Sequence, residues 1–224
     1  MWRRKSFPTR FILSKQPIFY PAKPEPCVGD VLEIGPGNGE FLCAQARVFP
    51  SKRFVAVELK PLRFRKLVAM IQRESIKNVL LIHADARILP QYFPEGSFEK
   101  VYVLFPDPWP KPRHAFRRLL TVEFLRILAG QLQDGGELIL ATDVQEYAEW
   151  VDQGVDQISA LRRIEGKETG GGALPATPQT FFGRKWRSQD KRILYRSYCK
   201  KQEITSSFPW SFPESPGILG GGSF

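Results

Sequence analysis

The sequence is poor in cysteine and has no long apolar run. Its three cysteines, Cys27, Cys43 and Cys199, are odd in number and lack metal-ligand spacing, so neither a disulfide framework nor a metal site is predicted. No apolar run approaches the ~20 residues needed to cross a bilayer. Residues 1–26 contain no apolar core of the secretory kind. We therefore expect a cytoplasmic protein with reduced thiols, no membrane association and no bound metal.

Acidic residues are scarce in three segments, which concentrates the net charge of +10 there. Residues 1–26 hold six basic and one acidic side chain, residues 111–118 hold four and none, and residues 180–201 hold eight and one. The rest of the chain carries a net negative charge. Three basic segments on a mildly acidic body indicate a polyanion-binding surface. Nucleic acid is favoured over a membrane surface, because no basic amphipathic helix is evident.

The length of 224 residues and the hydrophobic content of 42% predict one sizeable globular domain with appendages. Residues 1–26 are Pro-rich and weakly patterned, which predicts a flexible basic arm. Residues 27–202 would form the folded domain. Residues 203–224 are rich in Ser, Pro, Gly and Phe and would form a C-terminal tail.

Short apolar strands alternate with amphipathic helices along the domain. Strands are predicted over residues 30–34, 54–58, 79–82, 100–105, 137–141 and 192–200. Helices are predicted over residues 40–49, 61–74, 115–132 and 144–157. This alternation is typical of an α/β fold. We predict a Rossmann-like doubly wound sheet, mostly parallel with an antiparallel last strand, flanked by helices.

Acidic residues occur at or just beyond the ends of the first five predicted strands. They are Glu33, Glu58, Asp85, Asp107 and Asp143. Ligands of open parallel sheets bind at the carboxyl ends of the strands, where the strand order reverses. Five acids at that edge therefore predict a binding site.

The first strand runs directly into a glycine-rich turn. Glu33 precedes Gly35, Gly37 and Gly39, and glycine lets the backbone turn tightly and approach a ligand. A dinucleotide-binding fingerprint would need its third glycine at position 40, where this chain has Glu40. This register, with an acid before the first glycine, disfavours a pyrophosphate and favours a nucleoside with an amino group. S-adenosyl-L-methionine fits, since it carries an ammonium, a sulfonium and a ribose diol but no phosphate.

Two further acids could hold such a nucleoside. Glu58, at the end of the second strand, would accept hydrogen bonds from both ribose hydroxyls. Asp85, behind the third strand, would accept one from the adenine amino group, and Ala84 and Ala86 leave room for the ring.

Residues 104–118 read LFPDPWPKPRHAFRR and follow the fourth strand. Four prolines lack an N–H group, so neither a helix nor a central strand can continue through them. Asp107 is therefore expected on a stiff loop, with Trp109 two residues further on. The basic residues that follow are Lys111, Arg113, Arg117 and Arg118. A carboxylate, a flat aromatic ring and a cationic run together indicate a site for a base within a phosphate polymer.

These motifs together resemble the tRNA (guanine-N7-)-methyltransferase family. The resemblance spans about residues 30–200. It is carried by EIGPGNGEFL from Glu33, Val57-Glu58, His83-Ala-Asp85, FPDPWPK from Phe105 with the basic residues behind it, and Ala141-Thr-Asp143. It implies a class I S-adenosyl-L-methionine-dependent enzyme that makes 7-methylguanosine in tRNA, at guanosine 46 of the variable loop.

The resemblance also implies which residues form the site. Its cofactor-binding residues would be Glu33, Gly35, Gly37, Gly39, Glu58, Asp85, Ala86 and Asp107. Its tRNA-binding residues would be Lys111, Arg113, His114, Arg117, Arg118, Asp143, Thr180, Phe181, Phe182 and Gly183. The chain departs from the family pattern at Gly183, where similar proteins carry glutamate.

We interpret Asp107 as the catalytic residue. Guanine N7 has an in-plane lone pair and bears no proton, so methyl transfer needs alignment rather than an obligatory general base. A carboxylate near the ring would stabilise the positive charge that develops on the purine.

Two other interpretations remain open at this level. Asp107-Pro108 followed by Trp109 is similar to the Asp-Pro-Pro-aromatic loop of enzymes that methylate adenine amino groups. A non-catalytic RNA-binding protein on the same fold is the second alternative, although the complete series of acids disfavours it. We expect tRNA as the partner, and a monomer or a homodimer.

Overall fold

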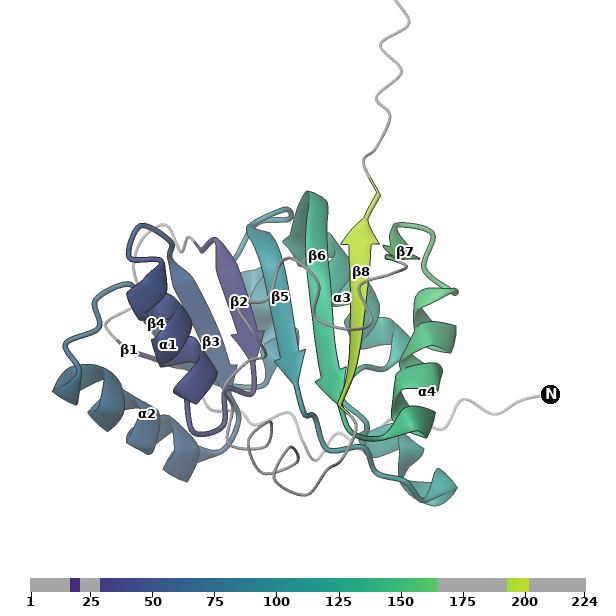
Figure 1. Cartoon of the computed structure of the whole chain (residues 1–224), viewed down its shortest axis with the longest axis horizontal. Coiled ribbons are helices and arrows are strands. Elements are labelled where there is room, and N and C mark those ends of the chain that lie inside the picture. Colours follow the sequence, from purple (N-terminus) through teal and green to yellow (C-terminus); the bar gives the residue numbers. More distant parts are fainter. Residues whose placement is uncertain (1–16, 21–28, 165–192, 202–224) are drawn as a thin grey trace, which may run out of the picture.

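Eight strands form one sheet at the centre of the molecule (Figure 1). The computed structural model describes residues 17–20, 29–164 and 193–201. The strands lie in the order β1-β4-β3-β2-β5-β6-β8-β7. Their bounds are β1 Ile18–Tyr20, β2 Val31–Ile34, β3 Phe54–Glu58, β4 Val79–His83, β5 Phe98–Leu104, β6 Leu132–Thr142, β7 Leu161–Arg163 and β8 Leu194–Lys200.

The central strands confirm the predicted doubly wound sheet. β4, β3, β2, β5 and β6 run parallel, and β8 is antiparallel to β6. The chain moves outward from β2 to β4 and then returns to place β5 on the other side of β2. Ile34 lies opposite both Val57 and Val103, so the carboxyl ends of β2, β3 and β5 reach the same level. Such a reversal of strand order is where open α/β sheets bind ligands.

Helices cover both faces of the sheet (Figure 1). The helices α1 and α2 share one apolar cluster with the strands, whereas α3, α4 and the short 3-10 helix η2 share the other. Their bounds are α1 Glu40–Val48, α2 Pro61–Arg73, η2 Ala86–Gln91, α3 Val122–Gln131 and α4 Gln145–Val155.

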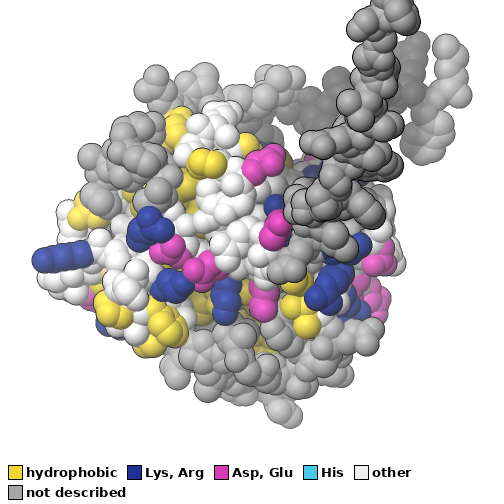
Figure 2. Space-filling view, turned by 90° about the horizontal axis from the view of Figure 1, so that it is seen from above, with side chains coloured by type: hydrophobic (Ala, Val, Ile, Leu, Met, Phe, Trp, Pro, Cys, Tyr) yellow, Lys and Arg dark blue, Asp and Glu magenta, His cyan; other side chains and the backbone are white. Residues whose placement is uncertain are grey.

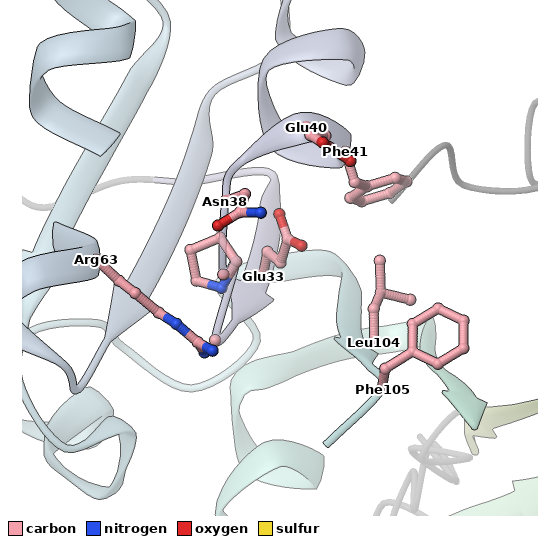
Figure 3. Close-up of a pocket in the computed structure, with 10 residues that line it drawn as sticks. Glu33, Asn38, Glu40, Phe41, Arg63, Leu104 and Phe105 are labelled. Carbon is pink, nitrogen blue, oxygen red and sulfur yellow. The ribbon is translucent and has the colours of Figure 1, made fainter. Parts of the chain in front are cut away.

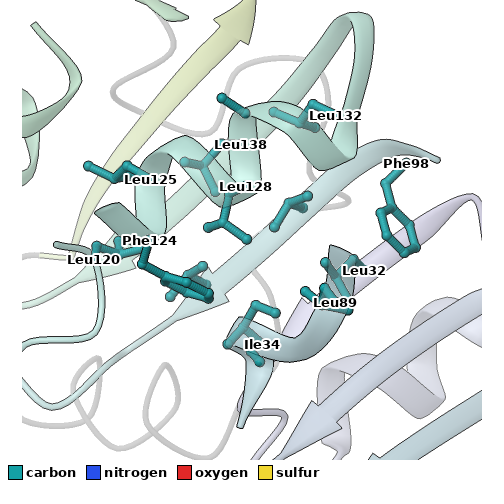
Figure 4. Packing of buried hydrophobic residues seen from close by; sticks show 14 of the residues in the cluster. Leu32, Ile34, Leu89, Phe98, Leu120, Phe124, Leu125, Leu128, Leu132 and Leu138 are labelled. Carbon is teal, nitrogen blue, oxygen red and sulfur yellow. The ribbon is translucent and has the colours of Figure 1, made fainter. Parts of the chain in front are cut away.

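Strand residues alternate between the two apolar clusters. Leu32 and Ile34 of β2 belong to the cluster shared with α3 and α4 (Figure 4). Val31 belongs to the cluster shared with α1 and α2. Successive side chains of a strand point to opposite faces, so Glu33 faces the α1 side. Because that face is covered too, the carboxyl group of Glu33 is buried.

One strand lies where the sequence predicted a flexible arm. β1 pairs antiparallel with β4, with Ile18 opposite His83. The ring of Phe19 meets the ring of Tyr92 edge-on, with 5.3 Å between the centroids. The predicted arm over residues 1–26 is therefore wrong for residues 18–20, and its remaining residues other than Pro17 lie outside the described residues. Three residues carry too little periodicity to be recognised as a strand.

The helix predicted over residues 115–132 begins later than expected. Pro112–Arg117 form a short 3-10 helix, η3, and Arg118 then has extended backbone angles, with φ −60° and ψ 138°. α3 begins only after Thr121, whose hydroxyl accepts a hydrogen bond from the Phe124 N–H at 3.3 Å. Because α3 begins here, the basic residues of segment 111–118 lie on the connection between β5 and α3 rather than on the helix.

The amino ends of the parallel strands form an edge of mixed charge. Figure 2 looks onto this side, where basic and acidic side chains lie next to one another. Arg53 pairs with Asp30 at 2.7 Å, and Lys52 pairs with Glu99 at 2.5 Å. Within the described part of the chain, no helix combines the length and apolar character needed to span a bilayer.

Candidate active site at the reversal of strand order

A pocket of about 240 Å³ lies between the ends of β2 and β5 (Figure 3). Its wall combines the glycine turn, the start of α1, one arginine from α2 and the end of β5. The lining residues are Glu33, Gly35, Pro36, Gly37, Asn38, Glu40, Phe41, Arg63, Leu104 and Phe105. The predicted glycine turn thus borders a concave site at the point where the strand order reverses.

The glycine turn depends on left-handed backbone conformations. Gly35, Gly37 and Gly39 have φ angles of 68°, 61° and 75°. A hydrogen bond of 2.8 Å from the Gly39 N–H to the Pro36 carbonyl closes the turn. A Cβ at position 39 would lie 2.3 Å from Cδ2 of Leu67. Only glycine therefore combines this φ angle with the close approach of the turn to α2.

Glu33 is the buried carboxyl group of the pocket. The residue is 3% exposed, and its Oε2 atom accepts no hydrogen bond from any described residue. Burial raises the pKa of Glu33 to about 8, and the negative charge of Glu58 is the second cause of this shift. A buried carboxyl without a partner is costly unless a ligand supplies a donor or a positive charge.

Glu58 and Asp85 occupy the next two strand ends. Oε1 of Glu58 accepts a hydrogen bond from the Lys60 N–H at 2.7 Å, whereas its Oε2 is buried and accepts none from the described residues. Asp85 caps η2, accepting from the Arg87 N–H at 3.0 Å and pairing with the Arg87 guanidinium at 2.7 Å. Ala86 beside it is buried. Glu58 and Asp85 do not line the pocket of Figure 3, although Glu58 is close enough to influence Glu33.

The loop after β5 is held in an unusual backbone conformation. Phe105 and Trp109 have φ angles of 51° and 43°. Such conformations cost about 1–3 kcal/mol each in a residue other than glycine and persist only when surrounding contacts impose them. The Phe105 N–H donates to the Ala141 carbonyl at 2.8 Å, which ties the start of the loop to β6. Asp107 is exposed on this loop, outside the lining of the pocket.

The ring of Trp109 is covered by neighbouring side chains. The Arg117 guanidinium lies 4.9 Å from the Trp109 ring centroid, and the His114 ring meets it edge-on at 5.8 Å. Both neighbours come from η3, which folds back over the loop. This arrangement favours packing of the Trp109 ring within the loop over stacking of that ring on a base.

The basic residues of this loop have two different environments. Lys111, Arg113 and Arg117 are exposed. Arg118 is half-buried and donates to the carbonyls of Pro108 and Trp109. The sequence showed one cationic run, whereas in the structure three of its cations are exposed and one is half-buried.

Comparison with known proteins identifies the family. A family model described as "Putative methyltransferase" matches residues 29–195. A tRNA (guanine-N(7)-)-methyltransferase from Chlorobium phaeobacteroides is 32% identical over 173 residues, which cover 76% of this chain and 80% of that protein. The chain belongs to the tRNA (guanine-N(7)-)-methyltransferase family. A member from Wolbachia pipientis is 42% identical over 130 residues, which cover 58% of this chain and 59% of that protein. The chain therefore matches less than two thirds of the length of this relative. For a Thermotoga maritima member, 40% identical, the match spans 51% of that protein.

Solved structures support the same fold. The 16S rRNA methyltransferase KamB superimposes with a TM-score of 0.55 and 20% identity, covering 80% of this chain and 90% of that one. This likeness indicates the class I methyltransferase fold. Family membership thus confirms the resemblance derived from the motifs.

Other predicted site residues of this family member lie apart from the pocket or outside the described residues. Asp143 follows β6 and is half-buried. Thr180, Phe181, Phe182 and Gly183 lie outside the described residues, so their predicted contacts with tRNA stay predictions. Among the residues that the structure describes, no three His, Cys, Asp or Glu side chains gather into a metal-binding cluster.

Sequence reasoning missed several residues of the pocket. Asn38 and Phe41 belong to the turn and the first turn of α1, and their proximity to the glycines was the available signal. Phe105 directly follows β5 and precedes Asp107 by two residues. Arg63 has no comparable signal, because its reach into the pocket depends on how α2 packs on the sheet (Figure 3).

Proposed function

We propose that the chain transfers a methyl group from S-adenosyl-L-methionine to N7 of a guanosine in tRNA. The proposed target is guanosine 46 of the variable loop. The observation that carries the proposal is the buried carboxyl of Glu33, which faces the pocket beside the glycine turn and lacks a partner among the described residues.

The residues of the site fit this cofactor. The carboxyl group of Glu33 is suited to bind the ammonium group of the cofactor. The ammonium would donate a hydrogen bond to Oε2, which has no partner among the described residues. Oε2 of Glu58 is likewise available for the ribose hydroxyls. Asp85 keeps further lone pairs beside those used by Arg87, so it can accept from the adenine amino group. S-adenosyl-L-methionine supplies an electrophilic methyl group when bound.

Asp107 is the proposed catalytic residue. Guanine N7 carries no proton, so the protein needs to orient the purine rather than remove a proton. As the purine becomes cationic, the Asp107 carboxylate stabilises the developing charge and accepts a hydrogen bond from the guanine N1–H or amino group. Its position supports this role, since the same loop begins with Phe105 in the wall of the pocket.

Exposed cations would hold the RNA. Lys111, Arg113 and Arg117 extend from the carboxyl edge of the sheet, with His114 between them and Asp143 after the neighbouring strand. Contacts with phosphates would give affinity without base specificity. We propose tRNA in the cytoplasm as the partner, with the protein acting as a monomer or a homodimer.

The test is to incubate the protein with unmodified tRNA and methyl-labelled cofactor, then digest the RNA and identify the labelled nucleoside. We expect 7-methylguanosine, mapped to position 46. Labelled 6-methyladenosine would replace the proposal by an amino-group methyltransferase. Binding of tRNA without any labelled product would support a non-catalytic RNA-binding protein.

A further inference from the structure

Arg118 differs from the other cations of the loop after β5 because its guanidinium is engaged within the protein. Its Nε donates to the Pro108 carbonyl at 3.1 Å, and its Nη2 donates to the Trp109 carbonyl at 3.4 Å. These two carbonyls belong to the residues that directly follow Asp107. Arg118 thus contacts the short segment that carries the proposed catalytic carboxylate.

The Arg118 guanidinium also lies over two aromatic rings of α4. It is 4.9 Å from the Trp150 ring centroid and 6.0 Å from that of Tyr147. The two rings are themselves stacked, with centroids 5.8 Å apart and an angle of 25° between their planes. Tyr147 is fully buried in the core, so this aromatic pair is a fixed support.

The loop between β5 and η3 has few N–H groups to donate, because it is rich in proline. Its prolines cannot donate, and both Phe105 and Trp109 hold left-handed φ angles. Tertiary contacts have to impose such a conformation. The Arg118 guanidinium provides two of them while it lies over the Trp150 ring, a combination that a lysine ammonium cannot reproduce.

We propose that Arg118 is a positioning residue that fixes the Asp107–Trp109 segment against α4, rather than a phosphate contact. This inference rests on the proposed function of Asp107. Arg118 is half-buried and two of its donors bond to loop carbonyls, so it has less freedom to meet RNA than the exposed Arg113 and Arg117. Among the basic residues of this loop, Arg118 therefore orders the loop, whereas the exposed Arg113 and Arg117 remain available to RNA.

The test compares Arg118→Lys with Arg126→Lys, an exposed arginine of α3. Both changes keep the charge and replace a planar guanidinium by an ammonium, but only the Arg118 guanidinium contacts the Pro108 and Trp109 carbonyls. We expect Arg118→Lys to lower kcat by about tenfold to a hundredfold. The KM for tRNA and its salt dependence should stay near the wild-type values, and Arg126→Lys should behave as wild type. Normal kcat in Arg118→Lys would overturn the proposal, and a raised KM for tRNA at normal kcat would point to a phosphate contact instead.

A second measurement does not depend on methyl transfer. Hydrogen exchange of the peptide covering residues 104–111 should become faster in Arg118→Lys, while exchange of the central strands stays as in the wild type. Unchanged exchange in this peptide would overturn the inference even if the protein makes 7-methylguanosine. If the wild type makes none, faster exchange would still establish the positioning role, and only the proposed function would fail.

Trp150→Leu provides an independent variant. If Trp150 acts by supporting the Arg118 guanidinium, the double variant with Arg118→Lys should lose no more kcat than the more impaired single variant. Fully multiplicative losses would mean that the two residues act separately, which contradicts the proposed arrangement.

Discussion

Replacement of Glu33 by glutamine should remove a pH dependence from cofactor binding. In the free protein, burial and the charge of Glu58 raise the pKa of Glu33 to about 8, so the carboxyl is mostly neutral at pH 7. A cationic cofactor favours the carboxylate and lowers this pKa again. Binding then releases a proton, and wild-type affinity should rise by up to about tenfold per pH unit between about pH 6 and pH 8.

Calorimetry in two buffers of different ionisation enthalpy measures this proton release directly. The wild type should release close to one proton more than Glu33→Gln at neutral pH. The comparison is made at or below pH 7, where the α-amino group of the free cofactor is mostly protonated already, so the difference reports mainly on Glu33. Equal proton release, or parallel pH profiles of affinity for the two proteins, would refute the idea that this carboxyl is held neutral until a cation arrives.

The raised pKa of Glu33 also affects stability. Stability should fall as the pH rises, whereas the affinity for the cofactor should rise. The folded protein holds the Glu33 proton more tightly than the unfolded chain does, so the free energy of unfolding should decrease as the pH rises from about 4.5 to about 8. A shift of this size corresponds to at most about 5 kcal/mol. Glu33→Gln should therefore be more stable than the wild type at pH 8 in denaturant titrations without cofactor. A less stable variant at this pH would contradict the assigned protonation.

Three further substitutions test separate parts of the site. Gly39→Ala, which combines a φ of 75° with a Cβ at 2.3 Å from Leu67, should lower the free energy of unfolding by about 2 kcal/mol or more, measured by denaturant titration. Asp107→Ala should lose turnover far more than cofactor affinity, and near-normal turnover would remove Asp107 from the mechanism. Arg113→Ala should weaken tRNA binding and reduce the slope of log affinity against log salt by about one. An unchanged slope would exclude a phosphate contact at this position.

Similar side chains have different functions in this protein because their surroundings differ. Asp30 is a surface acid whose pKa is lowered, mainly through its hydrogen bond from the Arg53 side chain. Glu33, three residues later, has a raised pKa because both faces of the sheet around it are covered. The Asp30 carboxylate forms a salt bridge with Arg53, whereas Oε2 of Glu33 has no partner among the described residues and is available to a ligand.

The sequence by itself determined the central architecture and the chemistry of the turn. Alternating strands and helices predicted the doubly wound sheet, and β3 (Phe54–Glu58) was predicted residue by residue. These features depend on local periodicity and on the conformational freedom of glycine, which a sequence displays directly. The motifs around Glu33 and Asp107 also identified the family before any fold was known.

Only the tertiary structure decided which of these residues face the pocket, the protein or the solvent. Arg117 and Arg118 are adjacent and chemically identical, yet the first lies over Trp109 of its own loop and the second over Trp150 of α4. Arg63 reaches the pocket only because α2 packs beside the glycine turn. Burial and contact arise from elements that are far apart along the chain, so no local pattern could distinguish these roles.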